Sequence, residues 1–294
     1  MGVDPTGEET RYSGITIHRI ADGKIAEEWG ESDNLEVVQP AFEREIRMRE
    51  RIEHELRIAR QIQQTLLPKT LPEVPGYKFG AYYRPAREVG GDFYDFLELQ
   101  DGRLGLIVGD VTDKGVPAAL VMATTRSVLR AAATRLLSLG EVLKSANDVI
   151  VQDTPPNMFI TCLYAILGPK SGRLVYANAG HDLPYRRRTE PGQGAEEFRA
   201  RGMPLGLMPQ MSYEEEEIVL GRGESVLSYS DGLVEAHDPQ REMFGFPRLR
   251  RLVAEHGKEE GFVDFLLEEL HSFTGEGWEQ EDDITLVTLQ RWTQ

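Results

Sequence analysis

The sequence predicts an α+β fold in which two β-sheets pack on each other and pairs of helices flank them. Three observations carry this prediction. Beyond residue 76, runs of strand type outnumber runs of helix type. The helical runs come in pairs between groups of strands, which is typical of α+β rather than of strictly alternating α/β chains. A long segment without glycine precedes this region and predicts one extended helix.

Residues 1–39 are the first predicted region and contain a β-hairpin. Two runs with alternating apolar residues, "YSGITIHRI" and "KIAEEW", are joined by "ADGK", and Asp-Gly between such runs is a strong hairpin signal. Two strands alone are marginal in water, so this hairpin needs a partner surface. The stretch "GITIHRIADGKIAEEWGESD" resembles the C-terminal end of SnoaL-like domains, which implies the remnant of a sensor domain.

Residues 40–67 are predicted to form a linker helix. Pro40 suits a first helical turn, and neither glycine nor proline follows until Pro68. A coiled coil that joins two copies as a homodimer is favoured over a helix lying on its own domain, although Arg49 and Gln63 interrupt the apolar seam. The seam consists of Phe42, Ile52, Leu56, Ala59 and Leu66.

Residues 68–294 are the third predicted region and contain both sheets. Pro and Gly become frequent here, and the apolar period changes from that of a helix to that of strands. The predicted strands are 77–84, 92–99, 103–109, 158–167, 173–178, 183–187, 215–220, 224–229 and 284–290. The predicted helices are 117–138, 141–152, 247–255 and 261–273.

Composition narrows the class of protein. The formal net charge is -16, and the only dense basic run is "YRRR", so we expect no nucleic-acid partner. No apolar run approaches the ~20 residues that span a bilayer, so we expect no membrane segment. The single cysteine, Cys162, excludes an intramolecular disulfide and a thiolate metal cluster, which fits a reducing cytoplasm.

Aspartates stand at the ends of apolar strands in four separate segments. Asp92 follows Gly90-Gly91, and Asp110 ends the run "LGLIVGD". Asp231 follows "SVLSYS", while Asp282 and Asp283 precede the last strand, in "DDITLVTL". Any one such aspartate is usually just part of a turn. Four together predict a convergent acidic cluster.

Several carboxylates at one end of a sheet stay ionised together only if a cation compensates their charge. Oxygen ligands without a Cys or His cluster favour Mg²⁺ or Mn²⁺ over Zn²⁺. Two such ions ~3.5–4 Å apart would suit phosphate ester hydrolysis. The neighbouring glycine, Gly91, permits backbone or phosphate to approach closely.

Seven motifs occur in an order that resembles one family. They are "EVGGDFYDF", "IVGDVTDKGVPAALVMA", "MFITCLYAIL", "YANAGHDLPY", "PLGL", "LSYSDGLVEA" and "EDDITLVTL". Together they resemble the SpoIIE-like branch of the metal-dependent Ser/Thr protein phosphatases, which includes RsbU-type sigma-factor regulators. The resemblance covers about residues 60–290 and implies a central β-sandwich of two antiparallel sheets flanked by helix pairs, as in type 2C phosphatases.

The resemblance also implies a role for each acidic residue. Asp110 would bridge both metals, and Asp92 would hold one of them with the backbone carbonyl of Val111. Asp231 and Asp282 would hold the other, with Asp283 in a supporting role. The nucleophile would be a hydroxide that bridges the two metals and attacks phosphorus in line, without a phosphoenzyme.

Other polar residues in these motifs stay open. Asp95 lies on the opposite strand face from Asp92 and is expected to be structural rather than a metal ligand. Asn178 is expected to fix its loop, and His181 is a possible general acid that a metal hydroxide would not require. Asp113 and Lys114 either line the mouth of the site or only form a turn. The residue that grips phosphate is unassigned, because Arg84 and Arg87 match no pattern.

The resemblance implies a cytoplasmic Mn²⁺- or Mg²⁺-dependent protein phosphatase. Its expected substrate is a phosphorylated anti-sigma factor antagonist of the STAS class. Two alternatives stay open, a non-catalytic signalling module and a hydrolase of small phosphates. The absence of a Gly-x-x-x-x-Gly-Lys-Ser/Thr loop argues against nucleotide binding of the P-loop kind.

Overall fold

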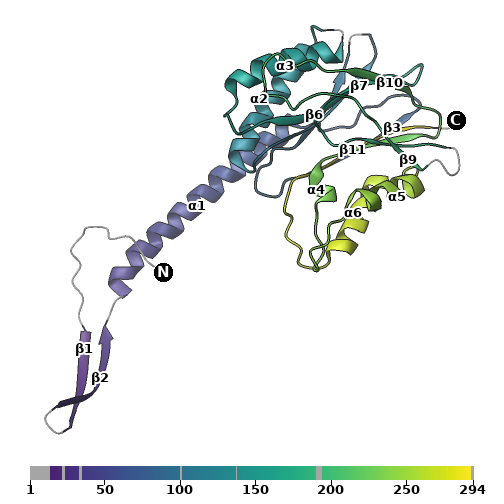
Figure 1. Cartoon of the computed structure of the whole chain (residues 1–294). Helices are drawn as coiled ribbons and strands as arrows, with labels where there is room; N and C mark the ends of the chain where they lie inside the picture. Colours follow the sequence, from purple (N-terminus) through teal and green to yellow (C-terminus); the bar gives the residue numbers. More distant parts are fainter. Residues whose placement is uncertain are drawn as a thin grey trace. The chain divides into compact units, whose positions relative to one another are not determined.

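The computed structural model describes residues 14–21, 24–32, 35–99, 101–136, 138–189 and 194–292. The chain divides into two compact units, residues 1–58 and 59–294, which are described separately. Figure 1 follows the chain through both units. Among the described residues, no helix combines the length and the apolar character that crossing a membrane requires.

The first unit contains the predicted hairpin and most of the linker helix. Strands β1 (Gly14–Ala21) and β2 (Lys24–Ser32) pair antiparallel, with Ala21 opposite Lys24, and the Asp-Gly turn lies outside the described residues. Helix α1 (Leu35–Leu66) begins five residues before Pro40, so the expectation that Pro40 lies in the first helical turn is wrong. Association of two such helices stays a prediction.

The second unit is built around two antiparallel sheets of five strands each. The first sheet has the order β10-β7-β6-β5-β4 and the second has the order β3-β12-β11-β8-β9. The first comprises β4 (Phe93–Glu98), β5 (Leu104–Val111), β6 (Ile160–Gly168), β7 (Arg173–Ala179) and β10 (Glu215–Val219). The second comprises β3 (Tyr77–Arg84), β8 (Tyr185–Arg187), β9 (Ala195–Glu197), β11 (Ser225–Tyr229) and β12 (Ile284–Arg291).

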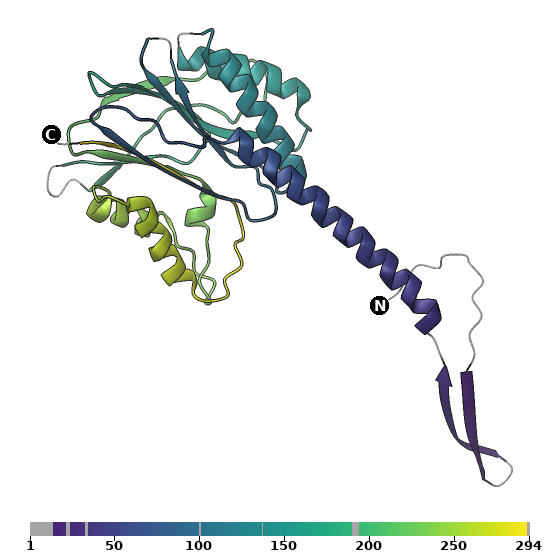
Figure 2. The same ribbon diagram turned by 180° about the vertical axis from the view of Figure 1, so that it is seen from behind.

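A helix pair covers the outer face of each sheet, which gives four layers (Figures 1 and 2). Helices α2 (Val116–Ala133) and α3 (Leu139–Asp153) pack on the first sheet. Helices α5 (Phe246–His256) and α6 (Phe262–Thr274) pack on the second. A central β-sandwich of two antiparallel sheets flanked by helix pairs is therefore confirmed.

Each interface between layers has its own apolar core. Leu106, Leu163 and Leu289 belong to the cluster between the two sheets. Met122 and Leu143 pack beneath the first helix pair, and a third cluster lies beneath the second pair. Inner strands such as β5 and β6 are thus buried on both faces, and their sequences read as nearly continuous apolar runs.

Two elements escaped the sequence prediction because both are very short. Strand β9 has three residues, "AEE", without an alternating apolar pattern. Helix α4 (Asp231–Val234) is a single turn, too short to show a helical period. Helix α2 also ends earlier than predicted, at Ala133, where a turn leads to α3.

Alternation along β4 separates the two aspartates of "GGDFYDF". Tyr94 belongs to a cluster between the sheets, whereas Asp95 points to the helix side and is almost fully buried. Its carboxylate pairs with Arg126 at 3.0 Å and with Arg130 at 2.6 Å, both on α2. Asp95 thus joins β4 to α2 by ion pairs, a structural arrangement stronger than ordinary hydrogen bonds.

We predict that Asp95→Asn destabilises the protein by about 3–5 kcal/mol, because it leaves arginine charges unpaired inside the structure. The free energy of unfolding in urea measures the effect. Asp101→Asn is the matched control, since Asp101 pairs with Arg103 at the surface, where ion pairs contribute little to stability. Equal losses in the two variants would contradict the structural role of Asp95.

Candidate active site

The four predicted acidic segments meet at one end of the sandwich. Asp92 directly precedes β4, and the pairing of Phe93 with Gly109 brings it opposite Asp110 at the end of β5. Asp231 begins α4 two residues after the end of β11, and Asp282 lies two residues before the start of β12. These two strands are also neighbours, with Tyr229 opposite Leu286. Sheet register therefore assembles the cluster from residues far apart in the sequence.

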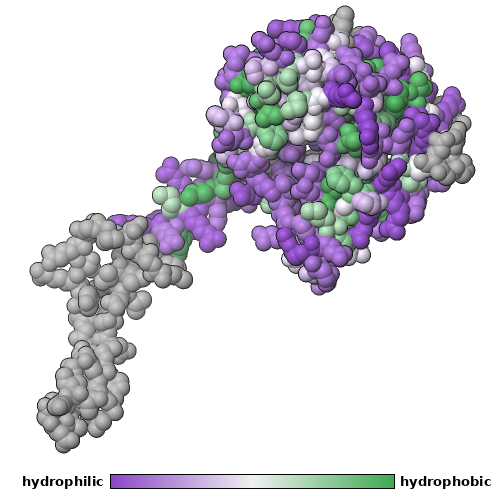
Figure 3. All heavy atoms as spheres, in the orientation of Figure 1, coloured by the Kyte–Doolittle hydropathy of each residue, from purple (hydrophilic) through white to green (hydrophobic). Residues whose placement is uncertain are grey.

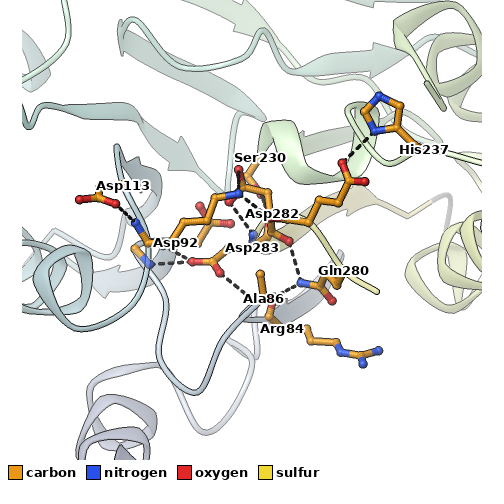
Figure 4. Close-up of polar contacts among 12 residues, drawn as sticks. Arg84, Ala86, Asp92, Asp113, Ser230, His237, Gln280, Asp282 and Asp283 are labelled. Atoms are coloured by element: carbon orange, nitrogen blue, oxygen red, sulfur yellow. Dashed lines mark hydrogen bonds and ion pairs between the residues drawn. The ribbon is translucent and has the colours of Figure 1, made fainter. Parts of the chain in front are cut away.

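Asp283 organises the loop that delivers Asp92. Its carboxylate accepts hydrogen bonds from the backbone N–H groups of Ala86 at 2.8 Å, Gly91 at 2.6 Å and Asp92 at 3.3 Å. Figure 4 shows Asp92, Asp282 and Asp283 gathered around this loop. Asp283 thus positions this loop through its backbone, and any part in cation binding stays a prediction.

The glycines before Asp92 make room for Asp283 and for the end of β5. A Cβ on Gly90 would lie 2.1 Å from the Asp283 carboxylate, and one on Gly91 would lie 2.8 Å from the carbonyl oxygen of Val111. A side chain at either position would force the loop away from β12 or β5. The close approach predicted for Gly91 therefore involves the backbone of this chain.

Asp92 is buried and held by a hydroxyl group. The Thr285 hydroxyl donates to its carboxylate at 2.7 Å, and the Ser230 oxygen in turn accepts from the Thr285 backbone N–H at 2.9 Å. Burial, with the charges of Asp110 and Asp283, raises the pKa of Asp92 well above its usual value. Thr285 and Ser230 thus fix the orientation of a carboxylate that is costly to ionise.

Asp110 and Asp231 are affected by burial and by neighbouring negative charges in the same way as Asp92. Burial, with the charge of Asp282 as a smaller cause, raises the pKa of Asp110 to about 6. Burial and the charge of Asp110 raise the pKa of Asp231 to about 7. Perturbed carboxylates that repel each other mark functional sites, and an added cation would relieve the repulsion.

The donor set fits a hard divalent cation, because it consists of carboxylate oxygens and the Val111 carbonyl. Within the described ranges, no three Asp, Glu, His or Cys side chains already converge as a metal cage. Two carboxylates instead hold groups of the chain: Asp92 binds Thr285, and Asp282 pairs with Lys114 at 2.9 Å.

Asn178 and His181 form a closed turn behind the cluster. Asn178 donates to the carbonyl oxygen of His181 at 2.9 Å and accepts from its backbone N–H at 2.7 Å, so it fixes the loop. The His181 ring contacts the Thr161 hydroxyl at 2.8 Å. Burial lowers the pKa of His181 to about 4, which makes the ring neutral near pH 7 and argues against a general acid.

Two residues at the site escaped the sequence analysis. Asp182 is mostly buried, one of its carboxylate oxygens lacks a hydrogen-bond partner, and burial with the charge of Glu235 raises its pKa to about 6. Gln63 brackets Gly90 with two hydrogen bonds, donating to its carbonyl at 2.6 Å and accepting from its N–H at 3.2 Å. The one signal for Gln63 was its intrusion into the apolar seam.

The sandwich with its acidic end defines a protein of the type 2C phosphatase fold. The solved SiaA-PP2C domain of Pseudomonas aeruginosa matches with a TM-score of 0.70 at 22% identity, covering 83% of this chain and 97% of that one. The family model described as Stage II sporulation protein E (SpoIIE) matches residues 100–292. The chain belongs to this family, as its motifs predicted.

Two curated relatives extend the likeness beyond the family domain. Protein IcfG of Synechocystis sp. is 32% identical over 265 residues, which cover 81% of this chain and 41% of that protein. The phosphoserine phosphatase RsbU of Bacillus subtilis is 29% identical over 249 residues, which cover 83% of this chain and 72% of RsbU. The chain thus spans less than half the length of IcfG.

We predict that Asp231→Asn stabilises the cation-free protein at pH 8 but not at pH 4. The folded-state pKa of Asp231 is raised to about 7, so stability is full near pH 4 and is lost as pH rises through 7, when the buried carboxyl ionises. At pH 8 the variant should exceed the wild type by up to about 4 kcal/mol, because each pKa unit between 3.8 and about 7 is worth about 1.4 kcal/mol. Urea unfolding at both pH values measures the difference, and a pH-independent difference would contradict it.

Proposed function

We propose that the chain is a divalent-cation-dependent protein phosphatase that hydrolyses phosphoserine or phosphothreonine. The observation that carries the proposal is the set of mutually repelling carboxylates, Asp92 buried and the others partly buried, that four segments bring to one end of the sandwich. Asp92, Asp110, Asp231 and Asp282, the four residues assigned as metal ligands, are all present, which argues against a degenerate, non-catalytic module.

The cluster is suited to hold two cations, Mg²⁺ or Mn²⁺. Asp92 and the Val111 carbonyl would hold one, Asp231 and Asp282 the other, and Asp110 both. When bound, these cations would supply activation of water and neutralise charge on the phosphoryl group. The chain itself contributes orientation: Asp283 fixes the loop before Asp92, and Thr285 fixes the Asp92 carboxylate.

The proposed substrate is a phosphorylated STAS-class antagonist of an anti-sigma factor, and the proposed location is the cytoplasm. The name of the relative RsbU, a phosphoserine phosphatase, supports a protein substrate. So does an apolar groove of about 400 Å³ between α2 and α3, lined by Val116, Leu120 and Met158 among others. Figure 3 shows apolar side chains gathered over these helices, a surface that a small phosphate would not need.

We predict that Asp110→Asn abolishes phosphate release from a phosphoserine STAS protein, lowering kcat/KM at least about 1,000-fold, because cation binding contributes several kcal/mol to the transition state. Mn²⁺-dependent release is compared with release from p-nitrophenyl phosphate. Activity that survives the substitution would refute the two-cation mechanism. Turnover of p-nitrophenyl phosphate alone would favour the small-phosphate hydrolase.

We further propose that helix α1 regulates the site through Gln63. Gln63 is buried and its amide binds both polar groups of the Gly90 backbone, next to the Gly91 N–H that Asp283 holds. A change in the position of this helix turn would therefore move the loop that presents Asp92. Two arrangements of α1 would then be two states of the catalytic cluster.

We predict that Gln63→Ala lowers kcat/KM about 10- to 100-fold, the usual cost of removing a partner that orients metal ligands. Gln64→Ala is the matched control, since Gln64 is exposed, and it should retain full activity. Deletion of residues 1–55 removes the N-terminal part of α1 and so tests the same coupling between this helix and the site. Unchanged turnover and cation dependence after both the deletion and Gln63→Ala would refute it.

A further inference from the structure

Lys114 supplies the positive charge that the acidic cluster holds in this structure. Its Nζ lies 2.9 Å from Asp282 Oδ2 and donates to the backbone carbonyl of Glu281. Among the described residues, this is the one ion pair that includes a proposed cation ligand. The charge also reaches further into the cluster, because Lys114 is a cause that lowers the pKa of Asp110.

The backbone around Lys114 is built to aim this side chain. Asp113 has φ 77°, a left-handed conformation that is strained for a residue other than glycine, and the next glycine, Gly115, has φ 77° as well. The Asp113 carboxylate accepts from the Lys114 backbone N–H at 2.8 Å (Figure 4 shows Asp113 at the edge of the cluster).

Both ends of this turn are anchored. Thr112 donates its backbone N–H to the carbonyl of Phe159 at 3.0 Å, and its hydroxyl accepts from the Phe159 N–H at 2.9 Å. On the other side Ala119 bonds to the Gly115 carbonyl at 3.0 Å as α2 begins. The base of Lys114 is therefore held in place, and only its flexible stem is free to move.

We propose that Lys114 is an internal counter-cation that occupies the place of one divalent cation and must leave Asp282 before that cation binds. The inference rests on the proposed function, because it concerns the same carboxylates. Asp282 cannot present one oxygen to an ammonium group and to a divalent ion together without bringing two cations into contact. The absence of a ready cage among the described side chains agrees with a site that must first release its lysine.

The exposure of Lys114 allows its ammonium group to leave Asp282, and its contacts indicate which cation site this release affects. The Lys114 and Asp282 side chains are 32% and 31% exposed, and ion pairs with that much solvent access are weak. Lys114 contacts Asp282 and the backbone carbonyl of Glu281. Competition should therefore weaken chiefly the cation site that includes Asp282, and the other site only through the charge that reaches the shared Asp110.

Isothermal titration with Mn²⁺ at pH 7.5 tests the inference without measuring activity. Lys114→Met keeps the length of the side chain and removes its charge, so the Kd of the weaker site should fall about three- to five-fold, the upper part of the range expected for losing a partly exposed ion pair. Lys114→Arg, which keeps a competing charge, should leave that Kd within about two-fold of wild type. Lys170→Met controls for net charge, because Lys170 follows the opposite end of β6.

Labelling of the wild-type protein provides a second test that needs no variant. Acetylation of Lys114 by an amine-reactive ester, followed by mass spectrometry, should increase when Mn²⁺ is added, because the amine leaves its carboxylate partner. Two bound cations with unchanged affinities in Lys114→Met, or Lys114 labelling that does not increase, would overturn this inference alone. Failure of the wild type to bind any divalent cation would overturn the proposed function itself.

Discussion

The arrangement of the site depends on one carboxylate that binds backbone rather than side chains. Asp283 directly precedes β12 of the second sheet, and its carboxylate accepts hydrogen bonds from backbone N–H groups of a loop that leads into the first sheet. It therefore fastens the two sheets together at the end where the acidic residues meet. The neighbouring glycines permit this contact, and the position of Asp92 follows from it.

The cluster is assembled against its own electrostatics. Burial of several aspartates raises their pKa values, so folding alone places charge where it is costly. The fold tolerates this cost because the three apolar interfaces and the ion pairs of Asp95, which stabilise it, lie away from the cluster. The carboxylates that are costly to ionise are thus separate from the contacts that stabilise the fold. This separation is expected for a site that receives a charged ligand.

Much of this architecture was predictable, and the failures have physical reasons. The strands and the helix pairs follow from the apolar period, and the acidic positions follow from aspartates at the ends of apolar strands, three of the four beside a glycine. Tertiary contacts between distant segments carry no such signal: nothing local in "IQQTLL" says that Gln63 will meet Gly90. The motifs assigned Asp283 only a supporting role beside Asp282, and the hydrogen bonds that it accepts from the loop before Asp92 could not be read from the sequence. His181 looked catalytic by residue type, but burial leaves it neutral near pH 7.

Because Gln63 contacts Gly90, the rotation of the linker helix about its own axis has to be correct at this residue. An α-helix turns about 100° per residue, so one residue inserted before Gln63 would present a different face to whatever holds the N-terminal part of the helix. Seven residues restore the phase to within about 20°. In any protein built on this plan, the spacing between an upstream module and the catalytic unit should therefore vary in near-heptad steps, and linker length itself carries information.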